Sequence, residues 1–272
     1  MLVPRYRAQT AGTDTGSYLE EGAVFGFCHV IIDVPPRLAE QASAFWSAAL
    51  GWPAGDPWPD HPEFRSLVPP VGDAYVHLQT GDHGPRIHLD AAVQDIDVET
   101  SRLLAVGAGS ARSGEAASTA APWESLLSPG GLPLCLIRSR PAVVPPPLQT
   151  PDGNRLRLVQ VCVDMPASST EQEVAFWRTA SGWHWVPSGI EAFAGKLHHR
   201  GASPVQLLLQ RLGDTDSSTT TRAHIDLGAD DVESAVRRLE ELGATRGPTG
   251  DGWVVLTDPV GMTFCVTGNA PD

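Results

Sequence analysis

Two segments of this 272-residue chain carry the same pair of chemically active side chains. The triplet His-Leu-Asp at 88–90 recurs as His-Ile-Asp at 224–226, and a cysteine follows each triplet, Cys135 and Cys265. Alternate residues of a strand point to the same face, so each aspartate lies beside its histidine. Asp90 can then hold the imidazole as a hydrogen-bond acceptor or act as a base. The alternative interpretation is that each histidine is a half-buried structural residue and each cysteine a small residue of the core.

These segments belong to a repeat that covers most of the chain. Phe-Trp at 45–46 returns at 176–177, and Gly-Trp at 51–52 returns at 182–183, so these landmarks move by 131 positions (182 minus 51). Self-similarity at a fixed spacing indicates units of one architecture. The copies also act as controls for each other, because a residue in one copy can be compared with the residue that replaces it in the other copy.

Composition limits the class of protein. A chain of 272 residues suits two domains of roughly 130 residues each. The hydrophobic fraction of 42% and the charged fraction of 19% are typical of a soluble globular protein. A net charge of −13 opposes binding to nucleic acid or to an anionic membrane. The four cysteines form no C-x-x-C pair and lie in apolar runs, which indicates reduced thiols. No apolar span or secretion signal is found, and a cytoplasmic location is predicted.

The elements that must position these side chains repeat as strand, helix and strands, twice in each copy. In the first copy the pattern predicts helices at 37–50 and 95–106, and strands at 27–34, 73–80, 86–93, 123–127 and 132–137. In the second copy a helix begins after Asp231 and ends at Gly243, and strands are predicted at 253–257 and 262–267.

The expected fold class is α+β, with two βαβββ modules in each domain. Two such modules side by side form a curved eight-stranded mixed sheet with the helices outside. The predicted division is a flexible tail at 1–23, a first domain at 24–138, a proline-rich linker at 139–155 and a second domain at 156–268.

This pattern resembles the vicinal oxygen chelate superfamily, which includes glyoxalases, bleomycin-resistance proteins and extradiol dioxygenases. The resemblance rests on His29 with the following Asp33-Val34-Pro35, on the Phe-Trp and Gly-Trp pairs, and on the runs 86–90 and 258–265. It covers about residues 24–138 and 156–268, as in the tandem glyoxalase-like subgroup. It implies a bowl-shaped sheet in each domain that binds a small molecule.

The resemblance also implies a metal site, because metal-dependent members use four inward-facing ligands from the first and last strands of both modules. The corresponding residues of the first domain are His29, His77, His88 and Cys135. Imidazole and thiolate together suit one zinc, iron, cobalt or nickel ion. The equivalents in the second domain are Gln160, Leu208, His224 and Cys265. Since leucine cannot bind a metal, no ion is expected there.

Other side chains are expected to line the two bowls and contact the small molecule. They are Trp58, Gln79, Gln160, His184, Gln210, His224 and Asp226. Asp90 is the candidate catalytic residue. His61 and His83 lie in turn-rich stretches and are expected to be solvated.

Three functions remain open on this basis. The first is a metal-assisted enzyme of the lyase, isomerase or dioxygenase type, in which the ion polarises neighbouring oxygen atoms of a small substrate. The second is a metal-free drug-binding or natural-product-binding protein of the bleomycin-resistance type. The third is a structural tandem without activity. A monomer or a homodimer fits each of them, because the tandem can complete its own bowls.

Overall fold

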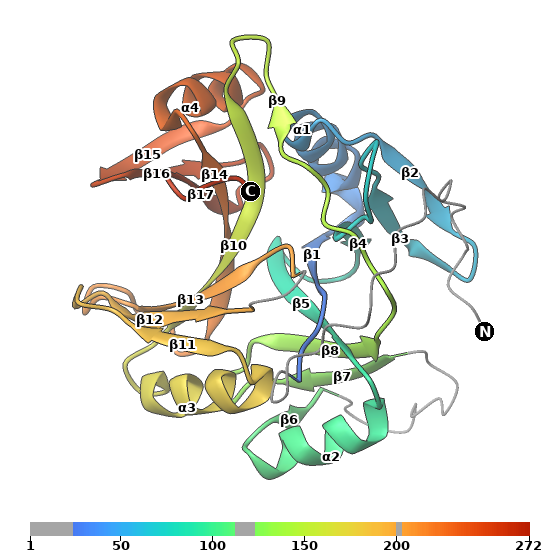
Figure 1. Ribbon diagram of the computed structural model, residues 1–272, viewed down its shortest axis with the longest axis vertical. Helices are drawn as coiled ribbons and strands as arrows, with labels where there is room; N and C mark the ends of the chain where they lie inside the picture. The colour runs from blue at the N-terminus through green and yellow to red at the C-terminus, as the bar shows by residue number, and fades with distance from the viewer. Residues whose placement is uncertain (1–23, 112–122, 200–202) are drawn as a thin grey trace.

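The computed structural model describes residues 24–111, 123–199 and 203–272. Within these ranges the chain forms two curved mixed sheets with helices on their outer sides (Figure 1). This is the predicted α+β architecture. The predicted tail, residues 1–23, lies outside the described residues. No helix in the described ranges is both long enough and apolar enough to cross a membrane.

The first sheet has the strand order β2-β3-β4-β1-β5-β8-β7-β6. Its strands are β1 (Cys28–Val34), β2 (Ala54–Trp58), β3 (His61–Leu67), β4 (Val76–Thr80), β5 (Arg86–Val93), β6 (Gly109–Ser110), β7 (Trp123–Leu127) and β8 (Pro133–Arg138). Its helices are α1 (Ala39–Leu50), which follows a short 3-10 helix (Pro36–Leu38), and α2 (Ile96–Ala105). The modules join where β1 and β5 pair antiparallel, and each of these strands pairs in parallel with the last strand of its module.

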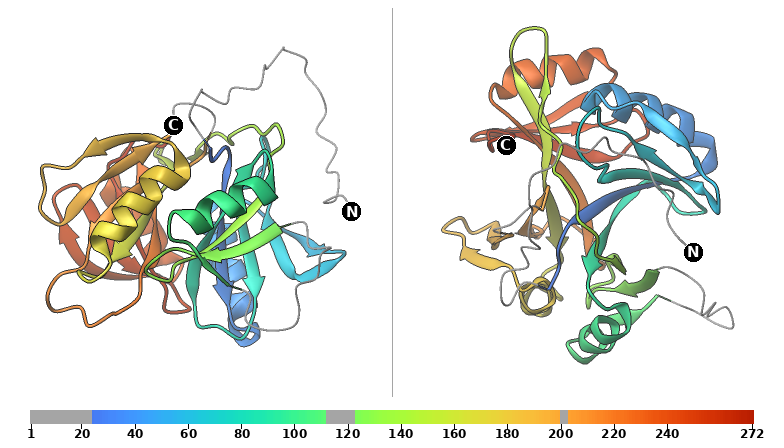
Figure 2. Two further views of the ribbon diagram at one scale, coloured as in Figure 1. Left: turned by 90° about the horizontal axis from the view of Figure 1, so that it is seen from below. Right: turned by 45° about the vertical axis from the view of Figure 1, so that its right-hand side comes forward.

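The second sheet repeats this topology in the order β11-β12-β13-β10-β14-β17-β16-β15. Its strands are β10 (Arg155–Met165), β11 (His184–Pro187), β12 (Phe193–His198), β13 (Gln206–Arg211), β14 (Arg222–Ala229), β15 (Thr245–Gly250), β16 (Trp253–Thr257) and β17 (Thr263–Thr267). Its helices are α3 (Thr170–Ser181) and α4 (Val232–Glu241). The ribbon views show the two domains side by side (Figure 2).

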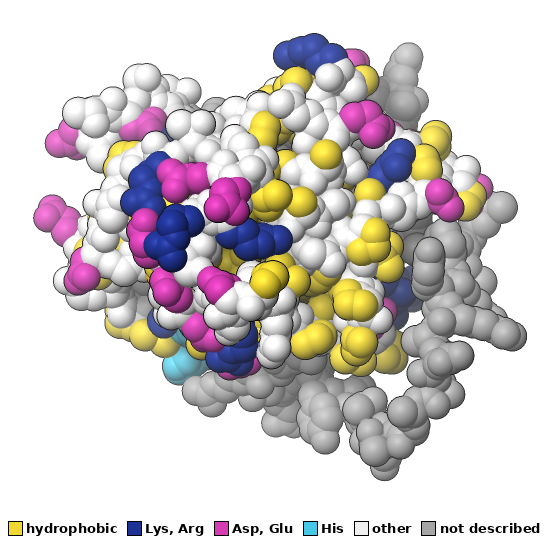
Figure 3. Space-filling model, turned by 90° about the horizontal axis from the view of Figure 1, so that it is seen from above, with side chains coloured by type: hydrophobic (Ala, Val, Ile, Leu, Met, Phe, Trp, Pro, Cys, Tyr) yellow, Lys and Arg dark blue, Asp and Glu magenta, His cyan; other side chains and the backbone are white. Residues whose placement is uncertain are grey.

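Local sequence explains where the helices begin and end. α1 ends at Gly51 and α3 at Gly182, whose φ values of 69° and 65° favour glycine. α4 begins after Asp231, whose carboxylate accepts a hydrogen bond from the Ser234 N–H at 3.0 Å. The buried residues of this helix are Ala235, Val236 and Leu239, and Figure 3 shows charged side chains gathered on the α4 side of the molecule.

The predicted bounds agree closely for several strands, and one prediction needs a correction. The strands expected at 86–93, 123–127 and 253–257 have those bounds. The prolines of 139–155 were expected to prevent sheet pairing, but β9 (Leu148–Gln149) pairs with the start of β10. These two residues follow the three consecutive prolines at 145–147 and keep their backbone N–H groups, so they can join a sheet edge.

An arginine of each domain caps the C-terminal end of a helix in the other domain. Arg238 of α4 donates hydrogen bonds to the carbonyl oxygen atoms of Ala49 (3.1 Å) and Ala48 (2.5 Å), at the end of α1. At the opposite end of the molecule, Arg102 of α2 donates to the carbonyl oxygens of 179–180 in α3. Figure 1 shows these helix pairs, α1 with α4 and α2 with α3. A guanidinium here satisfies carbonyls that lack helical partners and matches the negative end of the helix dipole.

Two buried tryptophans continue this interface, with different acceptors. Trp46 of α1 donates from Nε1 to Asp258 Oδ2 at 3.0 Å, across the domain boundary. The corresponding Trp177 of α3 donates to Glu173 Oε2 at 2.6 Å. Glu173 in turn accepts hydrogen bonds from the Ser128 hydroxyl (2.6 Å) and from the backbone of the same turn in the first domain. The two domains are therefore joined through buried, hydrogen-bonded contacts at both ends.

We expect Arg238→Ala to lower the free energy of unfolding by about 1–3 kcal/mol, because it removes two charged hydrogen bonds at a helix end. Arg237→Ala is the matched control, since the neighbouring arginine is exposed, and its effect should stay within about 0.5 kcal/mol. Urea denaturation of the three proteins measures the difference. Equal effects of the two substitutions would show that the contact with α1 does not contribute to stability.

Candidate functional site

The central strands of the first sheet bring the predicted site residues to one face. Ile31 of β1 lies opposite both His77 of β4 and His88 of β5, and His29 lies opposite Asp90. Asp90 in turn lies opposite Cys135 of β8. Because alternate residues share a face, the side chains of these strands converge on the concave side of the sheet.

His29 and His77 form a buried pair of imidazoles. Nδ1 of His29 lies 2.9 Å from Nε2 of His77, and the rings stack at 26°. Burial, with the neighbouring His77 second and Arg140 third, holds the pKa of His29 well below its ordinary value. Burial likewise lowers the pKa of His77 to about 4. Both rings are therefore neutral at pH 7, with one nitrogen donating and the other accepting.

Two further residues extend this pair toward the edge of the sheet. The Ser66 hydroxyl of β3 lies 2.9 Å from Nδ1 of His77, and Trp58 donates from Nε1 to the same hydroxyl at 3.1 Å. Trp58 is a predicted ligand-binding residue, whereas no residue pattern in the sequence marks Ser66. Its role depends on the pairing of β3 with β4, which sequence spacing alone does not reveal.

His88 lies between two aspartates. Its Nδ1 is 2.9 Å from Asp33 Oδ2, and its Nε2 is 3.4 Å from Asp90 Oδ1. Burial alone would lower the pKa of His88, but its contacts with Asp33, Asp90 and Cys135 outweigh burial and hold that pKa well above the ordinary value. Arg86 also donates to Asp33 Oδ2 at 2.8 Å. The ring is thus a protonated imidazolium with a carboxylate on either side.

Cys135 completes a second group with His88 and Asp90. One ligand atom from each of the three residues lies within 4.8 Å of the others. Burial, followed by the nearby Asp90, raises the pKa of the Cys135 thiol, so it stays protonated and is a poor nucleophile. Asp90 Oδ1 is buried and accepts no hydrogen bond within the described chain. The predicted ligand set is therefore divided into the pair His29–His77 and a group of His88 and Cys135 with Asp90.

The second domain keeps the histidine between two carboxylates but not the imidazole pair. His224 Nδ1 lies 2.9 Å from Asp164 Oδ2, and its Nε2 lies 3.5 Å from Asp226 Oδ1. His224, Asp226 and Cys265 form a group like that of the first domain. The repeated residue pattern predicted this correspondence, but it indicated no partner for Asp33 or Asp164.

Amide and apolar side chains replace the imidazole pair in the second domain. Gln160 takes the place of His29 and donates a short hydrogen bond to Asp226. Gln206 donates to Gln160 at 2.6 Å, and Leu208 takes the place of His77. The two domains therefore offer different chemistry beside the same charged cluster.

The remaining predicted ligand-binding residues occupy different positions. Gln79 and Gln210 lie opposite Asp33 and Asp164 in their sheets. Gln210 accepts a contact from the Cys162 thiol at 3.6 Å. His184 is exposed on the edge strand β11. It lies opposite His198, at some distance in the sheet order from the strand that carries His224.

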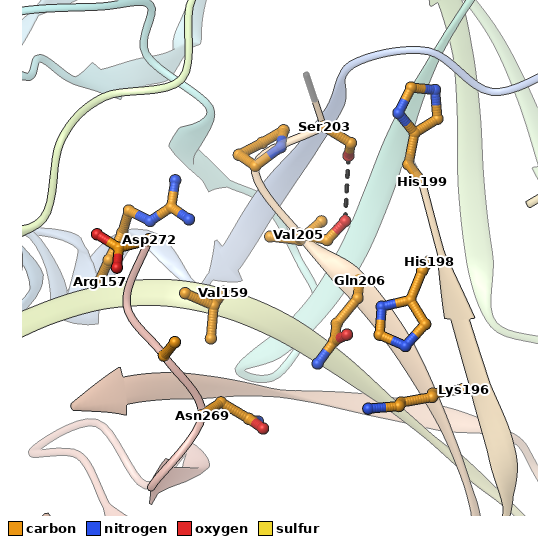
Figure 4. A pocket seen from close by; sticks show the side chains of 12 residues that line it. Arg157, Val159, Lys196, His198, His199, Ser203, Val205, Gln206, Asn269 and Asp272 are labelled. Carbon is orange, nitrogen blue, oxygen red and sulfur yellow. Dashed lines mark hydrogen bonds between the residues drawn. The ribbon is translucent and has the colours of Figure 1, made fainter. Parts of the chain in front are cut away.

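A cavity of about 290 Å³ lies in the second domain beside this amide chain. Figure 4 shows Lys196, Gln206 and Asn269 directed toward one another, with His198 next to Gln206. Burial and the charge of Lys196 lower the pKa of His198. Through Gln206 and Gln160 the cavity is linked by hydrogen bonds to Asp226, so a ligand there would adjoin the charged cluster.

Comparisons with known proteins agree with this fold. A family model for the glyoxalase-like domain matches residues 29–137 and again residues 160–267. No curated protein matches the chain.

Solved structures share the fold at low sequence identity. The Mn(II)-bound glyoxalase from Novosphingobium aromaticivorans is 17% identical, with a TM-score of 0.62 over 90% of this chain and 82% of that one. A mutant of 4-hydroxymandelate synthase from Streptomyces coelicolor is 16% identical, with a TM-score of 0.58 over 92% and 93%. A xylose isomerase-like TIM barrel/4-hydroxyphenylpyruvate dioxygenase fusion protein is 13% identical, with a TM-score of 0.58 over 90% of this chain. This chain spans about half the length of that fusion protein (49%).

The neutral imidazole pair predicts a specific loss of stability in acid. Between about pH 4 and 6.5 the unfolded chain binds protons at these histidines that the folded chain does not, so stability falls as the pH falls. The double variant His29→Gln, His77→Leu, which carries the residues of the second domain, removes this effect. From pH 6.5 to 5 its free energy of unfolding should fall by about 2–3 kcal/mol less than that of the wild type. If the free energies of unfolding of the wild type and the double variant fall equally from pH 6.5 to 5, the two histidines are not a neutral pair.

Proposed function

Because the chain belongs to the glyoxalase-like domain family, we propose that its first domain is a divalent-metal-assisted enzyme of the lyase or isomerase type. Its substrate is a small molecule with neighbouring oxygen atoms. The observation that carries the proposal is the group formed by His88, Asp90 and Cys135, whose ligand atoms lie within 4.8 Å of one another.

The donor set of this group fits a transition-metal ion. It offers nitrogen, oxygen and sulfur, which together suit zinc, iron, cobalt or nickel. Asp90 Oδ1 is buried and pairs with Nε2 of His88 at 3.4 Å, so an ion that displaced the His88 proton would take over this pairing. Asp33 engages Nδ1 of His88, which leaves Nε2 toward Asp90. A carboxylate behind the imidazole is the usual support for a metal-bound histidine.

The geometry supports an exchange of the roles first expected for Asp90 and the imidazole pair. Asp90, expected as a catalytic base, belongs to the group that would hold the ion. His29 and His77, expected as ligands, form a neutral hydrogen-bonded pair whose environment includes Asp90 and His88. In this proposal the pair binds and orients an oxygen of the substrate. When bound, the ion supplies Lewis-acid polarisation of adjacent substrate oxygen atoms.

Loss of His88 should remove the bound metal while loss of its second-domain counterpart should not, because Gln160 donates a hydrogen bond to Asp226 in the second group and engages the carboxylate that an ion would need. We expect about one equivalent of transition metal in protein purified without chelators, little in His88→Ala, and about one equivalent in His224→Ala. Elemental analysis measures the content of each protein, and circular dichroism checks the fold. A wild type without metal, or a His88→Ala variant that keeps it, would remove the proposal. Two equivalents would instead show that the second domain also holds an ion.

Metal affinity should rise with pH, because an ion must displace the proton held by His88. The contacts of His88 with the two aspartates keep its pKa well above the ordinary value, so the proton is present at neutral pH. The Cys135 thiol is also protonated and must lose its proton to bind the ion, so below both pKa values the apparent affinity should increase about a hundredfold per pH unit for two released protons. Calorimetric titration with Zn²⁺ in buffers of different ionisation enthalpy counts the released protons. An affinity that is flat from pH 6 to 8 would exclude His88 as a ligand.

A metal-free binding role is the second candidate, and the cavity beside Lys196 and Gln206 favours it for the second domain. A ligand at 100 times its Kd should raise the free energy of unfolding by about 2.7 kcal/mol. A thermal-shift screen of chelator-treated protein tests this role. Stabilisation that is lost in Gln206→Ala but kept in His88→Ala would assign the ligand to the second domain.

A further inference from the structure

Aromatic side chains close the concave face of the first sheet. Trp58 of β2, His61 and Phe64 of β3, and Trp123 of β7 form this aromatic seam. The His61 and Trp123 ring centroids are 4.7 Å apart, and those of Phe64 and Trp123 are 6.0 Å apart. β3 and β7 are each second from an end of the strand order, so this contact joins opposite sides of the sheet. His61, expected in a solvated turn, is half-buried here because the curvature of the sheet brings β7 to it.

The seam is continuous with the imidazole pair. Trp58 stacks on Phe64 with centroids 5.0 Å apart and planes at 18°. The rings of Trp58 and His77 are T-shaped to each other with centroids 5.4 Å apart, and both side chains hydrogen-bond the Ser66 hydroxyl. A chain of contacts therefore runs from Trp123 at the seam to His29 inside the sheet.

The imidazoles of the first domain are almost completely buried. His29, His77 and His88 are only 7%, 5% and 5% exposed. A ligand that reaches them must displace side chains, and the ring contacts between β3 and β7 are weak enough for this. Each aromatic pair contributes about 0.5–1.5 kcal/mol beyond the area it buries. A ligand that offers a ring face of its own replaces the contact it breaks.

The second domain lacks the seam at the corresponding position. Phe193 corresponds to Phe64, since each lies opposite a glutamine, Gln210 or Gln79. Trp253 begins β16 as Trp123 begins β7, but its ring packs over Gly250 of its own hairpin. In the described part of the second domain, no ring contact joins Phe193 to Trp253. Only the first domain combines an aromatic closure with the imidazole pair.

We infer that the first domain takes a planar aromatic molecule with a hydroxyl or carbonyl substituent. The ring enters by separating His61 from Trp123 and stacks on the layer of Trp58 and Phe64. The polar substituent hydrogen-bonds Nε2 of His29, because both nitrogens of His77 already engage His29 and Ser66. This inference concerns the site of the proposed function and adds the substrate class, but ring stacking does not require an ion.

Binding of 2-naphthol and of its saturated analogue decahydro-2-naphthol tests the inference, because the two share a hydroxyl and a carbon skeleton. Calorimetric titration of the full chain should show at least tenfold tighter binding of 2-naphthol. Phe64→Leu should weaken 2-naphthol binding about tenfold and leave the analogue unchanged. Phe193→Leu is the matched control in the second domain and should change neither affinity. Trp58→Phe keeps a stacking ring and should retain most of the preference.

The possible results separate this inference from the metal proposal. Equal affinity for the two probes, or equal losses in Phe64→Leu and Phe193→Leu, would overturn the aromatic assignment. Elemental analysis of the same proteins reports the metal independently. A protein without metal that still prefers 2-naphthol supports the inference and rejects the metal proposal. A metal-bound protein without the preference does the reverse.

Discussion

The hydrogen bond between Asp33 and His88 joins the two modules of the first domain at the centre of its sheet. A buried charge is tolerated only with a partner, so this contact requires β1 and β5 to keep their antiparallel register. The same bond, between Asp164 and His224, holds the corresponding strands of the second domain. The other buried polar residues of each sheet lie around this aspartate–histidine pair.

What surrounds the pair differs between the domains, and the difference gives each a separate chemistry. In the first domain a neutral imidazole pair and an aromatic closure lie beside the charged histidine. In the second, an amide chain of Gln206 and Gln160 leads from a cavity to Asp226. One charged framework thus supports a closed site with aromatic walls and an open polar one.

The repeat in the sequence predicted the architecture because the same motifs follow one another in the same order in both copies. Residues 88–90 and 224–226 hold equivalent places in their sheets, although they are shifted by 136 positions (224 minus 88) and not by 131. The site was less predictable, since its contacts join strands that are far apart in the chain. Asp33 is separated from His88 by 55 positions, and nothing in its local pattern marks it as a partner. Trp123 and His61 meet only because the sheet curves, and residue patterns give strand faces rather than curvature.

The reciprocal closure of helix ends by Arg102 and Arg238 has the form of an interface between identical subunits, in which one surface must serve both sides. Covalent linkage of the halves releases that requirement. Asp258 receives the indole of Trp46 at one end, whereas Glu173 and Ser128 share the equivalent task at the other. The two halves of the chain can therefore evolve into unlike partners. A substitution that would change both ends of a symmetric dimer changes the contacts at only one end here.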